Sequence, residues 1–249
     1  ALGSYRRSAL ASAKLVALAR LVGRVAARSG LRVVALKHAA LCLSGIVSPA
    51  GRGAVDADLL VSDRDAPRLA AALAREGFRE HDVPGHGHQH RALVHPRAGM
   101  LELHRYLPGV RPLAAGPQAG LEALVAHGLV RPVDAAEPGL LLPHAPVLLG
   151  HALAHALYQH GLEPRAHAPL RLLADAADLR AVAGAALIES ALPLVAAEVS
   201  EEDARAAWAL PPLLAAGGLD AAFAEPGSPE ARLLAHFLRG ALDPGYPAS

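Results

Sequence analysis

Two aspartates one residue apart, Asp56 and Asp58, lie in the segment VDADLLV at residues 55–61. The segment has the length and apolar character of a strand. Side chains at positions i and i+2 of a strand point to the same face, so both carboxylates project together. Adjacent carboxylates repel each other, and a divalent cation removes that cost by supplying the counter-charge. The pair is a candidate magnesium site, because Mg²⁺ prefers oxygen ligands and shares its coordination shell with phosphates.

A third carboxylate follows in the segment MLELHRY at residues 100–106. Glu102 and His104 share one face of the expected strand, and two leucines occupy the other. If this strand lies beside residues 55–61, Glu102 joins the aspartates, and three carboxylates can hold two metal ions about 3.5–4 Å apart. Glu102 is then also a candidate general base for an incoming hydroxyl group. The alternative is a solvated strand edge that carries carboxylates and binds no metal.

The elements that must position these residues follow from hydrophobic periodicity and turn residues. A helix is expected over 4–29. The next part of the chain predicts strands at 31–37, 55–61, 78–83, 88–95 and 100–107, and helices at 38–46 and 64–76. The tetrapeptide Pro-Arg-Ala-Gly between the last two strands is typical of a hairpin turn.

Beyond a connector at 109–120 the pattern changes. Helical periodicity recurs at 120–127, 146–160, 169–183, 184–198, 201–216 and 228–241, and no strand signal competes with it. We therefore expect an α+β chain with a mixed α/β domain at 1–110 and a helical domain at 111–249.

The composition argues against several classes of protein. A formal net charge of +1 predicts no bulk attraction to nucleic acid or to an anionic membrane. No uninterrupted apolar run reaches the roughly 18 to 20 residues of a membrane span. The single cysteine, Cys42, cannot form an internal disulfide, so we expect a cytoplasmic protein.

Histidines are frequent between residues 81 and 95, at His81, His86, His88, His90 and His95. In an extended chain the three at 86, 88 and 90 would share a face and suit zinc. The glycines among them favour a loop, in which His88 or His90 meets the substrate or solvent. His151 and His155 share a helix face but have no glutamate between them, so ordinary packing or a cleft-lining face explains them. Cys42 is expected to serve packing, because no base is apparent beside it.

The segment VVALKHAALCLSGIVSPAGRGAVDADLLVSDRD, followed by HRALVHPRAGMLELHRYL, resembles the uncharacterised nucleotidyltransferase family of the polymerase-beta-like superfamily. That family typically has a Leu-Lys-Gly turn, a loop arginine, an Asp-x-Asp-Leu-Leu-Val strand and a hairpin ending in Glu-Leu-His-Trp. The resemblance covers roughly residues 31–107, and LLGHALAHALYQHGL is a weaker match to the helical part of the family.

The resemblance implies a small mixed sheet flanked by helices, followed by a C-terminal helical bundle. It implies transfer of a nucleotidyl group from an NTP to a hydroxyl on a small molecule, peptide or protein, with Mg²⁺ or Mn²⁺. Asp56, Asp58 and Glu102 match the metal-binding carboxylates. The nucleotide-contact positions of the family correspond here to Lys37, His38, Arg52, His90 and His104.

Position 38 departs from the family pattern, because His38 replaces the glycine that allows close approach of a phosphate. This replacement motivates a second hypothesis, a nucleotide-binding or interaction module that has lost turnover. Phosphoryl transfer in natural-product tailoring uses the same residues and is a further alternative. A zinc hydrolase built on the histidines is a third, and it predicts stoichiometric zinc in the purified protein.

Overall fold

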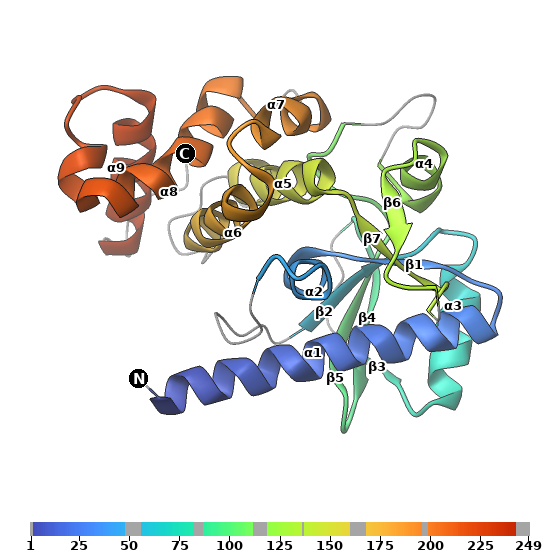
Figure 1. The fold of residues 1–249 in the computed structure, drawn as a ribbon. Coiled ribbons are helices and arrows are strands. Elements are labelled where there is room, and N and C mark those ends of the chain that lie inside the picture. The colour runs from blue at the N-terminus through green and yellow to red at the C-terminus, as the bar shows by residue number, and fades with distance from the viewer. Residues whose placement is uncertain are drawn as a thin grey trace. The chain divides into compact units, whose positions relative to one another are not determined.

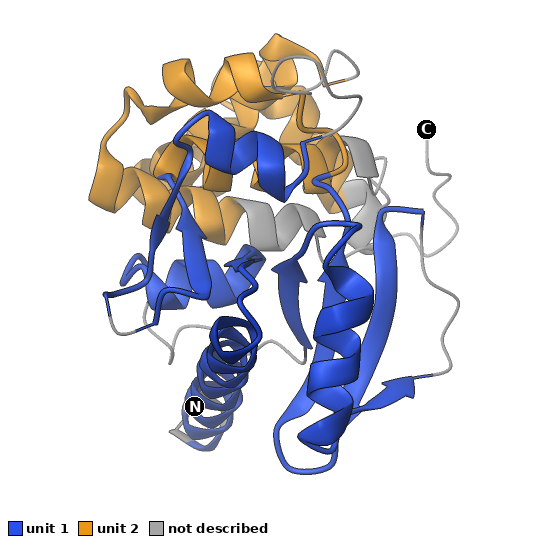
Figure 2. Cartoon of the chain, turned by 90° about the vertical axis from the view of Figure 1, so that its right-hand side faces the viewer, with its two compact units in different colours: residues 1–107, 112–144 blue, residues 108–111, 145–249 orange. Residues whose placement is uncertain are grey.

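The structure is a computed structural model (Figure 1), and it describes residues 2–47, 56–81, 87–111, 119–135, 137–159, 168–195 and 199–242. The chain forms two compact units (Figure 2). Unit 1 comprises residues 1–107 and 112–144, and unit 2 comprises residues 108–111 and 145–249. Where the sequence predicts a boundary after residue 110, the unit that contains the sheet extends to His144. That the two units are independent domains stays a prediction.

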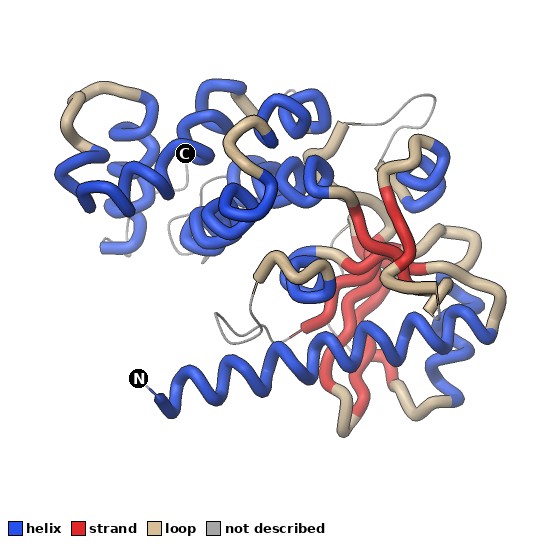
Figure 3. Tube along the Cα trace, viewed as in Figure 1, coloured by secondary structure: helices blue, strands red, loops and turns tan. Residues whose placement is uncertain are grey.

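Unit 1 is a seven-stranded mixed sheet with flanking helices, as the α+β fold class predicted. Its elements are α1 (Leu2–Arg28), β1 (Val33–Ala35), α2 (Lys37–Leu43), β2 (Asp56–Leu60), α3 (Ala66–Arg75), β3 (Arg79–His81), β4 (Gln89–His95), β5 (Gly99–His104), α4 (Leu121–Ala126), β6 (Val130–Pro132) and β7 (Leu140–Pro143). The strands follow the order β3-β4-β5-β2-β1-β7-β6. Figure 3 shows the strands in red with helices in blue around them. The helices and strands expected before residue 107 are confirmed, with shifts of a few residues at their ends.

The centre of the sheet sets the position of the acidic residues. β2 runs parallel to β5 and antiparallel to β1. One face of β2 and β5 carries fully buried aliphatic side chains, namely Ala57, Leu59, Leu101 and Leu103. Helix α1 contacts both strands as well as β1 and β7. Burial of this aliphatic face therefore fixes which way the alternating polar residues of the same strands must point.

Two strands, β6 and β7, lie between the helices expected at 120–127 and 146–160, so the expectation of no strand beyond residue 120 is wrong. β7 pairs parallel with β1, and β6 pairs antiparallel with β7 at the sheet edge. All four residues of β7 are buried. A short, fully apolar run of this kind has no alternation, so its periodicity cannot separate a buried strand from a helix. β6 ends in Pro132, which an edge strand tolerates because an edge position leaves one side of the strand unpaired.

Helix α1 approaches the start of β7 through glycine on both sides. A Cβ atom at Gly139 would lie 2.4 Å from Gly23 O, and one at Gly23 would lie 2.6 Å from Leu140 Cβ. Both contacts are shorter than side chains accept, so the separation of helix and strand depends on the absence of side chains here.

Replacing Gly23 by Ala is expected to lower the free energy of unfolding by about 1–3 kcal/mol, because the added methyl group overpacks the contact with β7. Gly3→Ala on the same helix is the matched control. Its nearest neighbour is the flexible end of Arg7, 3.7 Å away, so helix propensity should leave its stability equal or higher. Urea unfolding of both variants measures the difference, and a Gly23→Ala protein as stable as wild type would refute the close approach.

Unit 2 consists of helices, as the periodicity predicted. They are α5 (Ala145–Ala154), the π-helix η1 (His155–Gln159), α6 (Ala168–Ala183), α7 (Leu187–Ala191), the 3-10 helix η2 (Leu192–Leu194), α8 (Glu201–Ala222) and α9 (Pro229–Leu242). The guanidinium of Arg180 lies 5.4 Å from the ring centroid of Trp208, whose indole N–H donates to Ala185 O. The described part of the chain contains no helix that combines the length and apolarity needed to cross a membrane.

Candidate active site

The pairing of β2 with β5 places two carboxylates side by side. The strands are parallel neighbours in which Asp58 lies opposite Glu102 and Asp56 lies opposite Met100. The strands are thus neighbours, which is the condition under which the sequence makes Glu102 a third carboxylate of the site. Because paired residues of neighbouring strands point to the same face, both acids project together from the sheet.

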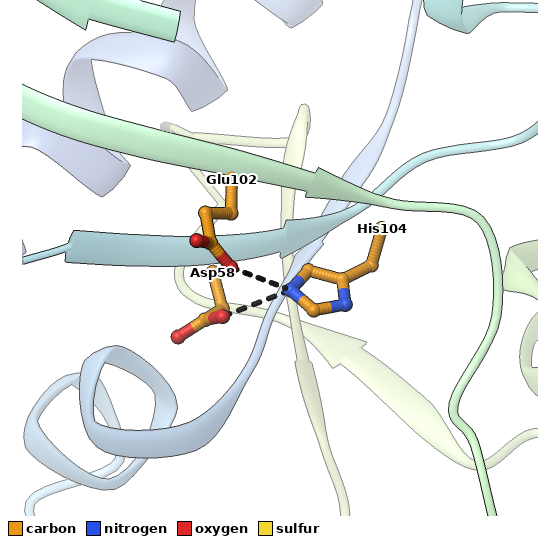
Figure 4. A group of neighbouring side chains, drawn as sticks. All are labelled: Asp58, Glu102 and His104. Atoms are coloured by element: carbon orange, nitrogen blue, oxygen red, sulfur yellow. Dashed lines mark hydrogen bonds and ion pairs between the residues drawn. The ribbon is translucent and has the colours of Figure 1, made fainter. Parts of the chain in front are cut away.

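His104 completes a compact group with these carboxyl groups, which we call the Asp-Glu-His cluster (Figure 4). Its Nε2 atom lies 2.8 Å from Asp58 Oδ1 and 3.7 Å from Glu102 Oε2. One ligand atom from each residue lies within 4.8 Å of the other two, and within the described ranges no other set of His, Cys, Asp and Glu residues has this spacing. Asp58 and His104 are buried, and Glu102 keeps 21% of its side chain exposed.

Lys37, the first residue of α2, reaches the cluster from the turn that follows β1. Its Nζ atom donates to Asp58 Oδ1 at 2.7 Å, and the preceding backbone amide of Leu36 donates to Asp58 O at 3.0 Å. Lys37 has a φ of +47°, in the left-handed region that a side chain with Cβ rarely adopts. Strain of this kind persists where the surrounding structure holds it, and it often marks a functional turn. Here the turn delivers an ammonium group to a buried carboxylate.

The two carboxyl groups of the cluster have opposite pKa shifts. Burial opposes the charge of Asp58, but the ammonium of Lys37 and the hydrogen bond from His104 outweigh burial and hold the pKa of Asp58 well below its usual range. Burial and the negative charges of Asp58 and Asp56 raise the pKa of Glu102. Burial lowers the pKa of Lys37, but its carboxylate neighbours outweigh burial and the net pKa is raised. Asp56, Asp58 and Glu102 therefore lie near a single lysine. Lys37 binds Asp58, so among the described residues Glu102 is left without a hydrogen-bonded cation to compensate its charge.

A β-bulge in β4 determines which residue of that strand faces the cluster. Gln89 pairs with His104 and Arg91 pairs with Leu103, so His90 is the extra residue between them. The bulge places Gln89 where regular pairing would place His90. The Gln89 amide nitrogen donates to Glu102 Oε2 at 2.7 Å. Sequence reasoning missed Gln89, because strand alternation alone assigns this face to His88 and His90.

His90 instead contacts Asp63, whose carboxylate lies 3.2 Å from the ring nitrogen Nε2. Arg105 binds the same carboxylate through two hydrogen bonds of 2.9 and 3.1 Å. Asp63 thus links His90 of β4 to Arg105, the residue that follows β5, at the protein surface. The structure does not bring His90 into the Asp-Glu-His cluster, and the bulge is the reason.

His88 lies against the cluster without joining it. Its ring stacks on His104 with centroids 5.4 Å apart and an interplanar angle of 29°, and it is 8% exposed. This contact covers one face of the His104 imidazole and restricts its rotation. The sequence identified His88 as a candidate, but it could not predict that the His88 ring stacks on His104. That contact depends on the register of β4 with β5.

The His38 side chain does not reach the cluster. Its Nε2 atom lies 2.9 Å from Ser12 Oγ on α1 and 3.5 Å from Cys42 Sγ, and the residue is 3% exposed. The positive φ of this turn falls on Lys37, so position 38 has helical geometry and does not use the conformational freedom of glycine. The expectation that no base lies beside Cys42 is wrong, because helix spacing brings this imidazole to the thiol.

The remaining predicted residues are distributed as follows. Asp56 lies at the start of β2, outside the cluster but close enough for its charge to raise the pKa of Glu102. Arg52 and His86 lie outside the described residues. The other described histidines form no group with metal-ligand spacing, so the zinc hypothesis gains no site from them. His151 and His155 contact each other with ring centroids 6.2 Å apart.

Comparison with known proteins identifies the family. The family model described as uncharacterised nucleotidyltransferase matches residues 2–199, which is most of the chain. The chain belongs to this family. It is a nucleotidyltransferase with a general role in nucleotidyl transfer. Searches among curated proteins and among solved structures found no match.

The donor set of this nucleotidyltransferase fits a divalent metal ion. Asp58 and Glu102 supply oxygen donors, which suit Mg²⁺ and Mn²⁺. Burial and the negative charges of Asp58 and Asp56 raise the pKa of Glu102, and a cation beside this carboxyl group would offset both effects. A bound ion would neutralise charge on the phosphates and lower the cost of bringing an anionic substrate to acidic residues.

Proposed function

We propose that this nucleotidyltransferase uses Mg²⁺ to transfer a nucleotidyl group from an NTP to a hydroxyl group of a small molecule, peptide or protein. The observation that carries the proposal is the pairing of Asp58 with Glu102 across β2 and β5, with the Lys37 ammonium 2.7 Å from Asp58. Carboxylates that hold a metal beside a lysine that binds phosphate oxygens are the parts that phosphoryl-group chemistry requires.

In the proposed reaction the acceptor oxygen forms a bond to the α-phosphorus of the NTP. The bond from that phosphorus to the bridging oxygen breaks, and pyrophosphate leaves. Asp56, Asp58 and Glu102 hold the metal, Lys37 binds the triphosphate as a point charge, and Glu102 is the candidate acceptor of the hydroxyl proton. Arg52 stays a proposed nucleotide contact from the family resemblance. The resemblance implies the same role for His38, His90 and His104, but their side chains contact Ser12, Asp63 and Asp58 respectively. Catalysis then consists mainly of positioning and of charge neutralisation.

The remaining properties are also proposals. The net charge of +1 supports an acceptor other than nucleic acid. The single cysteine supports a cytoplasmic location.

The test is incubation with Mg²⁺ and each of the four common NTPs, with hydroxyl-bearing peptides, sugars and the protein itself as acceptors. We expect pyrophosphate release with one or more NTPs and a mass increase of one nucleoside monophosphate on an acceptor. A mass increase of one phosphate would instead establish phosphoryl transfer. If no NTP raises the unfolding temperature in the presence of Mg²⁺ and no acceptor changes mass, the proposal is overturned.

A further inference from the structure

The hydrogen bonds of the two cluster carboxylates fall on one oxygen of each. Asp58 Oδ1 accepts from Lys37 Nζ at 2.7 Å and lies 2.8 Å from His104 Nε2. Glu102 Oε2 accepts from Gln89 Nε2 at 2.7 Å. Across the described residues neither Asp58 Oδ2 nor Glu102 Oε1 has a hydrogen bond or ion pair. In Figure 4 these two oxygens lie on the side away from the His104 ring.

The donors that occupy the other oxygens are held in place by packing and pairing. His104 is 1% exposed, stacks on His88 and comes from the end of β5. The bulge at His90 places the backbone of Gln89 opposite His104, and its side-chain amide is held by the hydrogen bond to Glu102. A carboxylate whose one oxygen is tied to an immobile donor has lost most of its freedom to rotate, so the direction of its second oxygen is set before any ion arrives.

The second nitrogen of His104 decides between two roles for this residue. A histidine that binds a metal through Nε2 carries its proton on Nδ1, and that N–H almost always donates to a carboxylate, carbonyl or water. His104 Nδ1 is buried and has no acceptor among the described residues. A buried N–H without an acceptor is rarer than an unfilled lone pair. The proton therefore belongs on Nε2, where it is donated to Asp58 Oδ1, and this nitrogen is not left to bind a metal.

We propose that His104 and Gln89 are positioning residues of the metal site: each holds one carboxylate oxygen, so that Asp58 Oδ2 and Glu102 Oε1 are presented as single-oxygen ligands to the same ion. This inference rests on the proposed metal-dependent function and deepens it. In this proposal His104 binds the Asp58 carboxylate and contacts neither the nucleotide nor the metal. Gln89 gains a role that sequence spacing does not indicate.

The experiment measures metal binding by the full-length protein without substrate. Mn²⁺ affinity is followed by the electron paramagnetic resonance signal of free Mn²⁺, and Mg²⁺ affinity by competition. His104→Leu and Gln89→Met remove the donors at similar volume, and each should weaken Mn²⁺ binding about 10–100-fold. His104→Gln is the matched control, because its amide can donate in place of Nε2, and it should stay within about threefold of wild type.

A second readout reports how the carboxylates bind. Infrared spectra of the Mn²⁺ or Mg²⁺ complex distinguish carboxylates that bind through one oxygen from those that bind through two, by the separation of their stretching bands. Wild type and His104→Gln should show single-oxygen binding, and Gln89→Met should show a shift toward two-oxygen binding. A loss of folded protein alone would not change this separation, and circular dichroism of each variant checks the fold.

The outcomes separate this inference from the proposed function. If Asp58→Asn abolishes Mn²⁺ binding while His104→Leu and Gln89→Met bind as wild type does, the positioning role is wrong and the metal site stands. If His104→Gln loses affinity as His104→Leu does, and Zn²⁺ affinity falls more than Mg²⁺ affinity, the imidazole is a metal ligand and the inference is overturned. If Asp58→Asn binds Mn²⁺ as wild type does, the metal site of the proposed function itself fails.

Discussion

Replacing Asp58 by Asn is expected to lower the rate of nucleotidyl transfer by a factor on the order of 10³, while the protein stays folded. The amide can still accept from Lys37 and His104, but it carries no negative charge for the metal. Initial rates of pyrophosphate release at saturating Mg²⁺ measure the change. Asp65→Asn is the matched control, because Asp65 precedes helix α3 and its side chain pairs with Arg68. If the Asp58→Asn protein transfers nucleotide at the wild-type rate, Asp58 is not a metal ligand.

The same substitution is expected to lower the stability of the metal-free protein. The pKa of Asp58 is below its ordinary value because Lys37 and His104 outweigh burial, so the ionised group stabilises the fold. That stabilisation is present above the unfolded pKa of about 3.8 and is lost as pH falls through the folded pKa. The difference between wild type and Asp58→Asn in urea unfolding with EDTA should therefore be largest at neutral pH and shrink in acid.

Replacing Glu102 by Gln is expected to lower transfer by a factor of about 10² to 10³ and, in the opposite direction, to raise the stability of the metal-free protein. The pKa of Glu102 is above its ordinary value because of burial and the charges of Asp58 and Asp56. The stability associated with its neutral form is fully present below the unfolded pKa and is lost as pH rises through the folded pKa. Glutamine keeps the neutral form at every pH and can still accept from Gln89.

Urea unfolding in EDTA at neutral and acidic pH, together with transfer rates in Mg²⁺, measures both effects. The stability gain should appear near neutral pH and vanish in acid, and saturating Mg²⁺ should reduce it, because a bound ion stabilises the wild-type carboxylate. Glu225→Gln, an exposed site in unit 2, should change neither quantity. A Glu102→Gln protein less stable than wild type at neutral pH in EDTA would show that the cluster does not carry uncompensated negative charge.

The opposite behaviour of two neighbouring acids follows from where their counter-charges lie. Lys37 and His104 both bind Asp58, whereas Glu102 receives a neutral amide from Gln89. The charge of Asp58 is thus compensated within the protein, whereas in the proposed function the charge of Glu102 is compensated by the metal ion. An active site commonly has lower stability than the scaffold around it, because groups poised for a ligand are left unsatisfied without it.

Much of the site follows from sequence spacing. Asp56 and Asp58 share a face because strands alternate, and Glu102 and His104 share a face for the same reason. The longer helices of unit 2, such as α6, α8 and α9, are also readable from the sequence, because their periodicity extends over two or more turns. These features depend on residues close together in the chain, so local geometry alone determines them.

Tertiary structure decided the rest. The pairing of β2 with β5 joins residues 56–60 to residues 100–104, and no local pattern specifies which strands become neighbours. Residues 140–143 form strand β7 because they pair with β1 and are buried there, and neither condition can be read from the local sequence. Because of the bulge at His90, Gln89 and not His90 contacts Glu102. The His38 ring, which the family resemblance assigned to the nucleotide, contacts Ser12 of α1 instead. Spacing along the sequence therefore determined which side chains share a face, and only long-range pairing and packing decided which groups those faces meet.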